Sequence, residues 1–453
     1  MSDNWYLDCA LSHNRSNSIV MSLTQAQKDI VSATVPIIRE HGLEVTSIFY
    51  AHLLEDHPEL KHLFSHSAQI TTHQASALAA SVYAYAANIN DLTPILPVVE
   101  RINQKHASLN IQPEQYDLVG SGLLSAFKEV LGDAFTDEVH DAWAAAYGQL
   151  AQIMIGREES IVSKHEQIPG GWRGFREMKI VKKVYESSEV TSFYLQPTDG
   201  ERLPTFEPGQ YISVRIRVPE LGFKQIRQYS LSDAPPTVSS KTDGTITPAL
   251  EHSFRISIKR DPGICLANKN AQHHPGYVSN LLHEHFTEGM TIEASHPAGE
   301  FVLDMDSNTS NPVVLMSGGV GITPVMSMLK TLASHTKNNR PVSWIHVARD
   351  KDSEAFTNEI RAITAEHRNV QSRIFHSRPS SQEHIGEDFD LKGRLDLSQV
   401  KDLLYLDSKD AQYYTCGGNS FMEANAKFLS EQGVEKQRIH LEVFGSGGYE
   451  LGA

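Results

Sequence analysis

Cysteine, basic charge and long apolar runs are all scarce in this 453-residue sequence. The three cysteines, Cys9, Cys265 and Cys416, form no C-x-x-C pair, so we expect neither a disulfide framework nor a thiolate iron–sulfur cluster. The formal net charge of −15 argues against nucleic acid and anionic membranes as partners. No apolar run approaches the ~18 residues that a membrane span needs.

The beginning of the chain also lacks the features of a targeting segment. Residues 1–20 contain Asp3 and Asp8 but no apolar core of the kind found in secretory signals. Together with the cysteine usage, this predicts a cytoplasmic protein, which we expect to be a monomer. At ~150 residues a domain, the length predicts about three domains.

The first domain is expected at residues 21–162 and is predicted to be all helical. Thr24-x-x-Gln27 is a capping box that opens a helix, and Gly42 is expected to close it. An Ala-rich helix is expected over about 68–88. This stretch carries no strand signal, so helices must pack on helices.

His106 is the candidate metal ligand in this domain. It shares an apolar helix stripe with Ile102 and Leu109. In an unknown helical domain, a core histidine with a satisfied hydrogen bond is the more frequent case. The alternative is an axial ligand, because neutral imidazole on an apolar helix face is how a globin holds haem iron.

A polar segment over 163–171, closed by Pro169 and two glycines, is expected to connect this domain to the next, after a last helix that ends near Ile161. The second domain, 172–306, is predicted to be an antiparallel β-barrel. From Ile212 onward, apolar and polar residues alternate strictly, which is typical of a strand with one buried face.

The next segment, Arg227-Gln228-Tyr229-Ser230, resembles the flavin-binding sequence of the ferredoxin–NADP reductase superfamily. A guanidinium can bind a pyrophosphate through two parallel hydrogen bonds, an aromatic ring can pack on isoalloxazine, and a hydroxyl can donate to flavin N5. Further on, Gly276 opens a helix whose free backbone N–H groups suit the same pyrophosphate. Taken alone, the four-residue motif is also compatible with an ordinary barrel strand.

The third domain, 311–447, is predicted to be an α/β doubly wound domain with a parallel sheet. The strand 312–316 runs into Gly318-Gly319-Val320-Gly321, and a helix is expected from Pro324. Strand, glycine loop and helix N-terminus form the layout that cradles a dinucleotide pyrophosphate. The superfamily has Cys-Gly-Pro where this chain has Cys416-Gly417-Gly418, with the cysteine near the nicotinamide.

Three segments of the first domain resemble the flavohaemoglobins: 47–50 on the distal side, and 101–108 with 112–116 on the proximal side. With the motifs of the other two domains, the resemblance runs from about Met21 to Gly445. It implies a nitric oxide dioxygenase that oxidises NO with O2 to nitrate. It also implies haem b, FAD and NAD(P)H as cofactors, with electrons passing from NAD(P)H through FAD to haem.

Position by position, the resemblance implies that His106 is the proximal iron ligand and that Tyr116 and Glu158 contact it. Tyr50 and Gln74 match the distal residues that act on bound O2. Phe64 matches an aromatic residue that packs on the haem, and Leu78 matches a leucine that crowds the bound ligand. For both residues, plain core packing is an equally good interpretation. The remaining positions that the resemblance marks as cofactor contacts are Lys105, Tyr211, Arg227, Gln228, Tyr229, Ser230, Gly276, Val278, Ser279, Gly319, Val320, Gly321, Ile322, Thr323, Pro324, Cys416, Glu442, Val443 and Phe444.

Two other functions compete with this one. The first is an O2- or NO-sensing haem protein, and the second is a general flavin reductase with an accessory globin. Tyr50 with Gln74 favours O2 chemistry. The choice between NADH and NADPH stays open, because Arg349, Arg373 and Arg378 could each meet a 2′-phosphate or water. Two polar insertions, about 235–251 and 261–275, have no assigned role.

Overall fold

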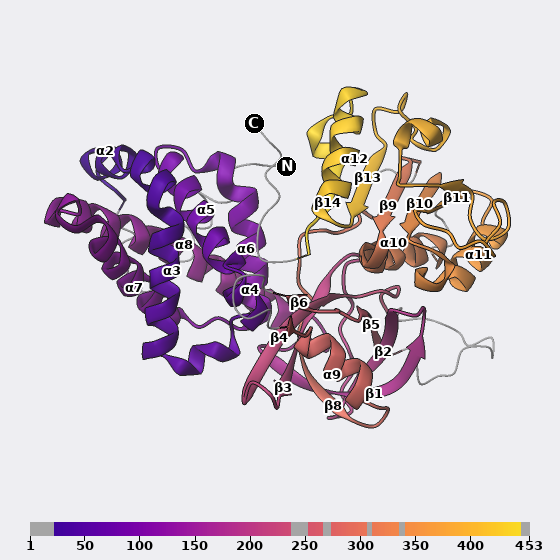
Figure 1. Ribbon diagram of the computed structural model, residues 1–453, viewed down its shortest axis with the longest axis horizontal. Coiled ribbons are helices and arrows are strands. Elements are labelled where there is room, and N and C mark those ends of the chain that lie inside the picture. Colours follow the sequence, from indigo (N-terminus) through magenta and orange to yellow (C-terminus); the bar gives the residue numbers. More distant parts are fainter. Residues whose placement is uncertain (1–21, 237–251, 266–272, 306–309, 335–339, 445–453) are drawn as a thin grey trace. The chain divides into compact units, whose positions relative to one another are not determined.

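The computed structural model describes residues 22–236, 252–265, 273–305, 310–334 and 340–444 (Figure 1). The chain divides into two compact units, of which the first runs to Gln167 and the second takes in most of the chain from Ile168. Within the described ranges, no helix is long and apolar enough to cross a membrane. The predicted domain limits inside these units stay predictions.

The first unit is built from helices around one apolar core, as predicted (Figure 1). Thr24 and Gln27 form the expected capping box: the Thr24 hydroxyl accepts from the Gln27 backbone N–H at 3.2 Å, and the Gln27 side chain accepts from the Thr24 backbone N–H at 3.0 Å. The α-helices are α2 (Gln25–Ala33), α3 (Val35–Asp56), α4 (His66–Ile70), α5 (His73–Ala87), α6 (Leu96–Leu109), α7 (Pro113–Leu131) and α8 (Asp137–Gln167).

Three helix boundaries differ from the prediction. Gly42 does not close a helix: the break comes at Thr34, before a proline in the first turn of α3, and α3 runs through Gly42. The Ala-rich helix is interrupted at Thr72, which takes a left-handed conformation with φ 61°. The helix α8 continues to Gln167 and so includes the first part of the predicted connector.

The second unit begins with a curled antiparallel sheet, as expected for the barrel domain (Figure 1). Its strand order is β4-β3-β8-β1-β2-β5, and a bridge between Leu231 and Ile256 links the end of β4 to the far edge. The helix α9 (Tyr277–His285) packs its buried face on this sheet. The strands are β1 (Phe175–Tyr185), β2 (Val190–Pro197), β3 (Tyr211–Val218), β4 (Phe223–Ser230), β5 (Phe254–Lys259) and β8 (Thr291–Ser295).

The two insertions have different outcomes. In the second, the short strand β6 (Ile264–Cys265) pairs antiparallel with β7 (His273–His274). No alternation of apolar and polar residues in this stretch is long enough to predict this pairing. Most of the first insertion lies outside the described residues.

The rest of the second unit alternates strand and helix around a parallel sheet of order β12-β11-β10-β9-β13-β14 (Figure 1). This confirms the predicted doubly wound architecture. The first helix, α10, begins at Ile322, two residues earlier than expected. The main elements are β9 (Val313–Gly318), α10 (Ile322–Ser334), β10 (Val342–Ala348), α11 (Thr357–Glu366), β11 (Val370–His376), β12 (Leu391–Lys392), β13 (Gln412–Cys416), α12 (Asn419–Glu431) and β14 (Ile439–Glu442).

Candidate functional site

The proximal residues predicted from the sequence meet around His106. Asn110, in a left-handed conformation, ends α6 four residues after His106, and Pro113 starts α7 so that Tyr116 falls in its first turn. The ring atom Nδ1 of His106 lies 3.0 Å from the Tyr116 hydroxyl and 2.8 Å from Oε1 of Glu158 on α8. Three helices therefore bring together residues that are far apart in the sequence.

Burial fixes where the protons lie in this triad. Tyr116 and Glu158 are each 7% exposed. Burial, followed by the nearby Glu158 charge, raises the pKa of the Tyr116 phenol well above its ordinary value, so the phenol keeps its proton and donates to the Glu158 carboxylate. With Nδ1 of His106 engaged by these partners, Nε2 remains as the metal donor. The His106 side chain is 29% exposed, so the ring is not fully enclosed by protein. An imidazole held in this way through Nδ1 fits the role of an iron ligand.

The distal residues also lie together. Tyr50 on α3 is buried, and the Phe64 ring meets it edge-on at 5.3 Å between ring centroids. The Gln74 side chain, from α5, hydrogen-bonds the Tyr50 hydroxyl, but burial outweighs this contact and raises the pKa of Tyr50 to about 12. Tyr50 therefore stays a phenol that can donate a hydrogen bond at neutral pH.

For three other globin positions the structure leaves the role open. Phe64 and Leu78 are partly buried and pack against the helical core, as either a haem contact or a plain core residue would. Lys105 precedes His106 and is half-buried. These assignments stay predictions.

The flavin motif lies at the end of β4. Ser230 is buried as the last residue of the strand, while Arg227, Gln228 and Tyr229 are partly buried. Burial lowers the pKa of the Arg227 guanidinium, and the nearby side chains of Tyr229 and Asp261 oppose that shift. Tyr211 starts the neighbouring strand β3 and exchanges two backbone hydrogen bonds of 2.9 Å with Ala298.

The N-terminus of α9 is positioned by its contact with Asp261. Gly276 caps the helix, and a Cβ there would lie 2.4 Å from the Asp261 Cβ, so no larger residue fits. The Ser279 hydroxyl donates to the Gly276 carbonyl and accepts from the Asp261 backbone N–H, both at 3.1 Å. Val278 and Ser279 are buried in this first turn. Backbone N–H groups at a helix N-terminus suit a pyrophosphate.

The nucleotide-binding candidates meet at the carboxyl end of the parallel sheet. Cys416 on β13 is in register with Ser317 on β9 and with Glu442 on β14. A Cβ on Gly321 would lie 2.2 Å from the Cys416 carbonyl oxygen, so a glycine is required where the loop approaches β13. Burial, then the Glu442 charge, raises the pKa of the Cys416 thiol, which therefore stays protonated.

The remaining predicted positions continue from these elements. Gly319, Val320 and Gly321 form a single 3₁₀ turn between β9 and α10, and Ile322, Thr323 and Pro324 open the helix. After β14 ends, Val443 is half-buried and the Phe444 ring is 44% exposed. An exposed aromatic at the end of the sheet is available to cover a flat ring.

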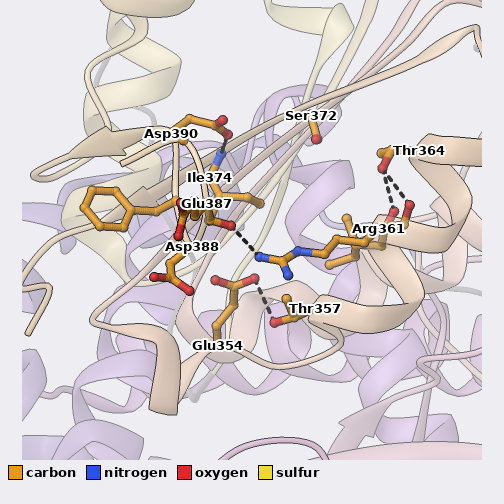
Figure 2. A pocket seen from close by; sticks show the side chains of 12 residues that line it. Glu354, Thr357, Arg361, Thr364, Ser372, Ile374, Glu387, Asp388 and Asp390 are labelled. Carbon is orange, nitrogen blue, oxygen red and sulfur yellow. Dashed lines mark hydrogen bonds between the residues drawn. The ribbon is translucent and has the colours of Figure 1, made fainter. Parts of the chain in front are cut away.

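A polar pocket of about 120 Å³ lies elsewhere, between α11, β11 and residues 386–390. Figure 2 shows that its polar groups contact one another: Glu354 accepts from Thr357, Arg361 donates to the Glu387 carbonyl, and Asp390 accepts from the Ile374 N–H. None of the predicted site residues lines it. We assign no ligand to this pocket.

Sequence reasoning missed a charged cluster that includes Asp233, three residues after the flavin motif. Asp233, Arg255, Lys330 and Glu359 come together from segments more than twenty residues apart. The available signal was an arginine in the stretch 254–258, whose other residues are apolar or small and in which all five residues are buried.

Comparisons with known proteins agree with this architecture. A globin family model matches residues 47–154, and an oxidoreductase NAD-binding domain model matches residues 315–427. The crystal structure of a flavohemoglobin from Malassezia yamatoensis, with bound FAD and heme, is 28% identical with a TM-score of 0.77, covering 94% of this chain and 100% of that one.

Two relatives match over nearly their full lengths. A flavohemoprotein of Bordetella parapertussis is 43% identical over 426 residues, which cover 94% of this chain and 99% of the relative. A flavohemoprotein of Rhizobium meliloti is 42% identical, covering 93% of this chain and 98% of the relative. At this identity and coverage, and with the globin and NAD-binding models matching in the same order, the chain belongs to the flavohemoprotein family.

Proposed function

We propose that this oxidoreductase is an NAD(P)H-dependent nitric oxide dioxygenase, which oxidises NO with O2 to nitrate. The observation that carries the proposal is the 2.8 Å contact between Nδ1 of His106 and the buried Glu158 carboxylate. A carboxylate that accepts the Nδ1 proton gives the imidazole imidazolate character. That character favours O2 activation over reversible O2 storage.

Haem b, FAD and NAD(P)H are the cofactors that the helical unit, the antiparallel barrel and the parallel-sheet part of the chain would hold, in that order. When bound, they supply O2 binding at iron, conversion of a two-electron donor to one-electron steps, and the hydride. His106 would hold the iron through Nε2. Arg227 to Ser230 and the first turn of α9 would hold FAD, and residues 319–324 would hold the pyrophosphate of NAD(P)H.

On the distal side, Tyr50 would donate a hydrogen bond into the O2-binding site. Its phenol stays protonated because burial raises its pKa to about 12. Gln74 orients that hydroxyl through a side-chain hydrogen bond. A fixed donor of this kind acts without having to reorganise during the reaction.

On the proximal side, Tyr116 and Glu158 would act through His106. The Tyr116 hydroxyl donates to Glu158, which fixes the carboxylate in place. The carboxylate in turn fixes the ring orientation and tautomer of His106. These two residues therefore position the ligand.

The test is NO consumption by the purified, haem- and FAD-loaded chain with O2 and NADH. Each NO converted to nitrate by O2 takes one electron and NADH supplies two, so NADH loss should be about half the NO loss. A gas sensor would bind O2 or NO without turnover. A general flavin reductase would oxidise NADH equally with and without NO. Either result would overturn the proposal.

We further propose that the chain works as a monomer in the cytoplasm. The proposal is supported by the scarcity of cysteine and by the high net charge, which disfavours self-association. Light scattering on the loaded protein would test the first statement, since a stable dimer would double the measured mass.

A further inference from the structure

A network of four charges, in which Arg255 is buried and its three partners are partly exposed, joins the barrel to the nucleotide-binding segment within the second unit. Arg255 on β5 is 1% exposed, and its guanidinium contacts Glu359 of α11 at 2.6 Å and Asp233 at 3.7 Å. Lys330 of α10 completes the network, with Nζ 2.5 Å from Asp233 and 2.9 Å from Glu359. Two cations and two carboxylates thus alternate in one cluster.

The network connects the two segments whose cofactors must meet. Asp233 follows Ser230 of the flavin motif by three residues, and the Arg255 guanidinium also donates to the Ser232 carbonyl. Lys330 lies on α10, the helix that begins directly after the glycine loop. The Ser327 hydroxyl, on the same helix, donates to the Asp233 backbone carbonyl at 2.7 Å. The flavin motif and the pyrophosphate helix are therefore held by the same side chains.

The charge states keep this network intact around neutral pH. Burial by itself raises the pKa values of Asp233 and Glu359, but Arg255 and Lys330 outweigh it, so both pKa values fall below the ordinary range. Buried ion pairs are poor sources of stability, because desolvation offsets much of the attraction. Their geometry is nevertheless strict, since each charge must keep its partners. A strict geometry between two segments suits a positioning role.

We propose that Arg255 is a positioning residue for hydride transfer, holding the flavin motif and α10 at the separation that lets flavin and nicotinamide meet. The inference rests on the proposed cofactors but not on the NO reaction. In the step concerned, a C–H bond of the reduced nicotinamide breaks and its hydrogen leaves with both electrons. The flavin gains them at N5 and is reduced, while the nicotinamide is oxidised.

The test compares Arg255→Met with Arg255→Lys in full-length, FAD-loaded protein. Flavin reduction is followed by anaerobic stopped-flow absorbance over a range of NADH concentrations. We expect the limiting rate constant of Arg255→Met to fall on the order of 10²-fold, because a misplacement of ~1 Å has that effect. The apparent Kd for NADH and the FAD content should change little. Arg255→Lys keeps the charge and should recover part of the rate.

Arg215→Met is the matched control. Arg215 forms a bidentate ion pair with Glu293 at 2.7 and 3.0 Å, also partly buried, but both partners lie on barrel strands. This variant should reduce its flavin at the rate of the unchanged chain, even if it melts at a lower temperature. Equal losses of rate in Arg215→Met and Arg255→Met would show a general effect of destabilisation and overturn the proposal.

Glu359→Gln carries the test if Arg255→Met does not take up FAD. It removes the charge only on the α11 side of the network, and we expect a rate loss of roughly 10-fold. A limiting rate within about 2-fold of the unchanged chain would overturn the proposal. A normal Arg255 effect in a chain that does not consume NO would instead contradict the proposed function alone.

Discussion

The Glu158 carboxylate lies 2.8 Å from Nδ1 of His106, although 52 residues separate the two in the chain. The same oxygen accepts a hydrogen bond from the Tyr116 hydroxyl, so one buried carboxylate holds both the imidazole and the phenol. The contact depends on α8 passing behind α6, where the two helices pack together. The reactivity proposed for the globin rests on this arrangement.

Glu158→Gln should therefore reduce NO turnover while keeping haem bound. A neutral amide accepts the Nδ1 proton less strongly, and loss of an outer partner of a metal-bound histidine typically costs 10- to 100-fold in activity. Steady-state NO consumption is the measurement. Glu159→Gln, on the exposed side of the same helix, is the control and should be silent. Equal NO turnover in both variants would show that Glu158 has no role in the reaction.

Tyr50→Phe should accelerate O2 dissociation from the ferrous protein. Losing one hydrogen bond to the ligand should cost about 1–3 kcal/mol, or roughly 5- to 150-fold in affinity. Flash photolysis or stopped-flow displacement by CO measures the rate. In the control, Tyr85→Phe removes a buried hydroxyl that donates to the Ala146 carbonyl at 2.9 Å. That change should lower stability and leave O2 dissociation unchanged, and the opposite pattern would contradict the distal assignment.

Elements with a local signal could be predicted from the sequence. The capping box at Thr24, the alternation after Ile212 and the glycine loop before α10 each depend on neighbouring residues, and each was found where predicted. Helix boundaries were less accurate. Gly42 costs helix stability in isolation, but inside α3 it is buried and packs near Ala79 of α5, so tertiary packing overrides propensity.

The parts of the site that depend on distant contacts could not be read from local patterns. Glu158 and Tyr116 were placed near His106 only by family resemblance, because no spacing rule joins three helices. The network of Asp233, Arg255, Lys330 and Glu359 had neither a motif nor a resemblance to indicate it. A buried arginine can be recognised as part of an ion network only when its partners are known. Here the partners lie far away in the sequence and meet only in the folded chain.

Arg378→Ala should selectively impair use of NADPH. Of the three arginines considered for a 2′-phosphate, Arg349 is paired with Glu189 and Asp350, and Arg373 lies near Asp402. Among the described residues, the exposed Arg378 side chain has no such partner, and its backbone N–H bonds the Arg349 carbonyl at 2.7 Å after β10.

A charged hydrogen bond is worth about 1.5–3 kcal/mol, so kcat/KM for NADPH should fall at least 10-fold. The value for NADH should hold, and Arg373→Ala should alter neither. A parallel loss with both cofactors in Arg378→Ala would exclude this residue from recognition of the 2′-phosphate.

His376 should make stability depend on pH. It is fully buried between Glu354 at 2.8 Å and Glu383 at 2.5 Å. Burial alone would lower its pKa, but hydrogen bonds to both carboxylates outweigh burial and raise the pKa above its ordinary value. The folded pKa exceeds the unfolded value of about 6.5, so the stabilisation is complete below that pH and is lost as pH rises through the folded pKa.

Thermal melting of the unchanged chain and of His376→Gln, from about pH 6 to about pH 9, tests this sign. The imidazole is the only titratable group that differs between the two chains, so it dominates the difference between their melting curves. The Tm advantage of the unchanged chain should shrink as pH rises. An advantage that grows with pH would mean that the imidazole is neutral in the folded protein.

The central claim is that electrons pass within one chain from NAD(P)H through FAD to haem. Anaerobic stopped-flow mixing of the full-length protein with NADH and CO measures it directly, through flavin bleaching and formation of the ferrous CO complex. The flavin should be reduced first and the haem second, at a rate that does not depend on protein concentration. Ser230→Ala should slow both. A flavin that is reduced while the haem stays ferric, or haem reduction that scales with protein concentration, would contradict the account.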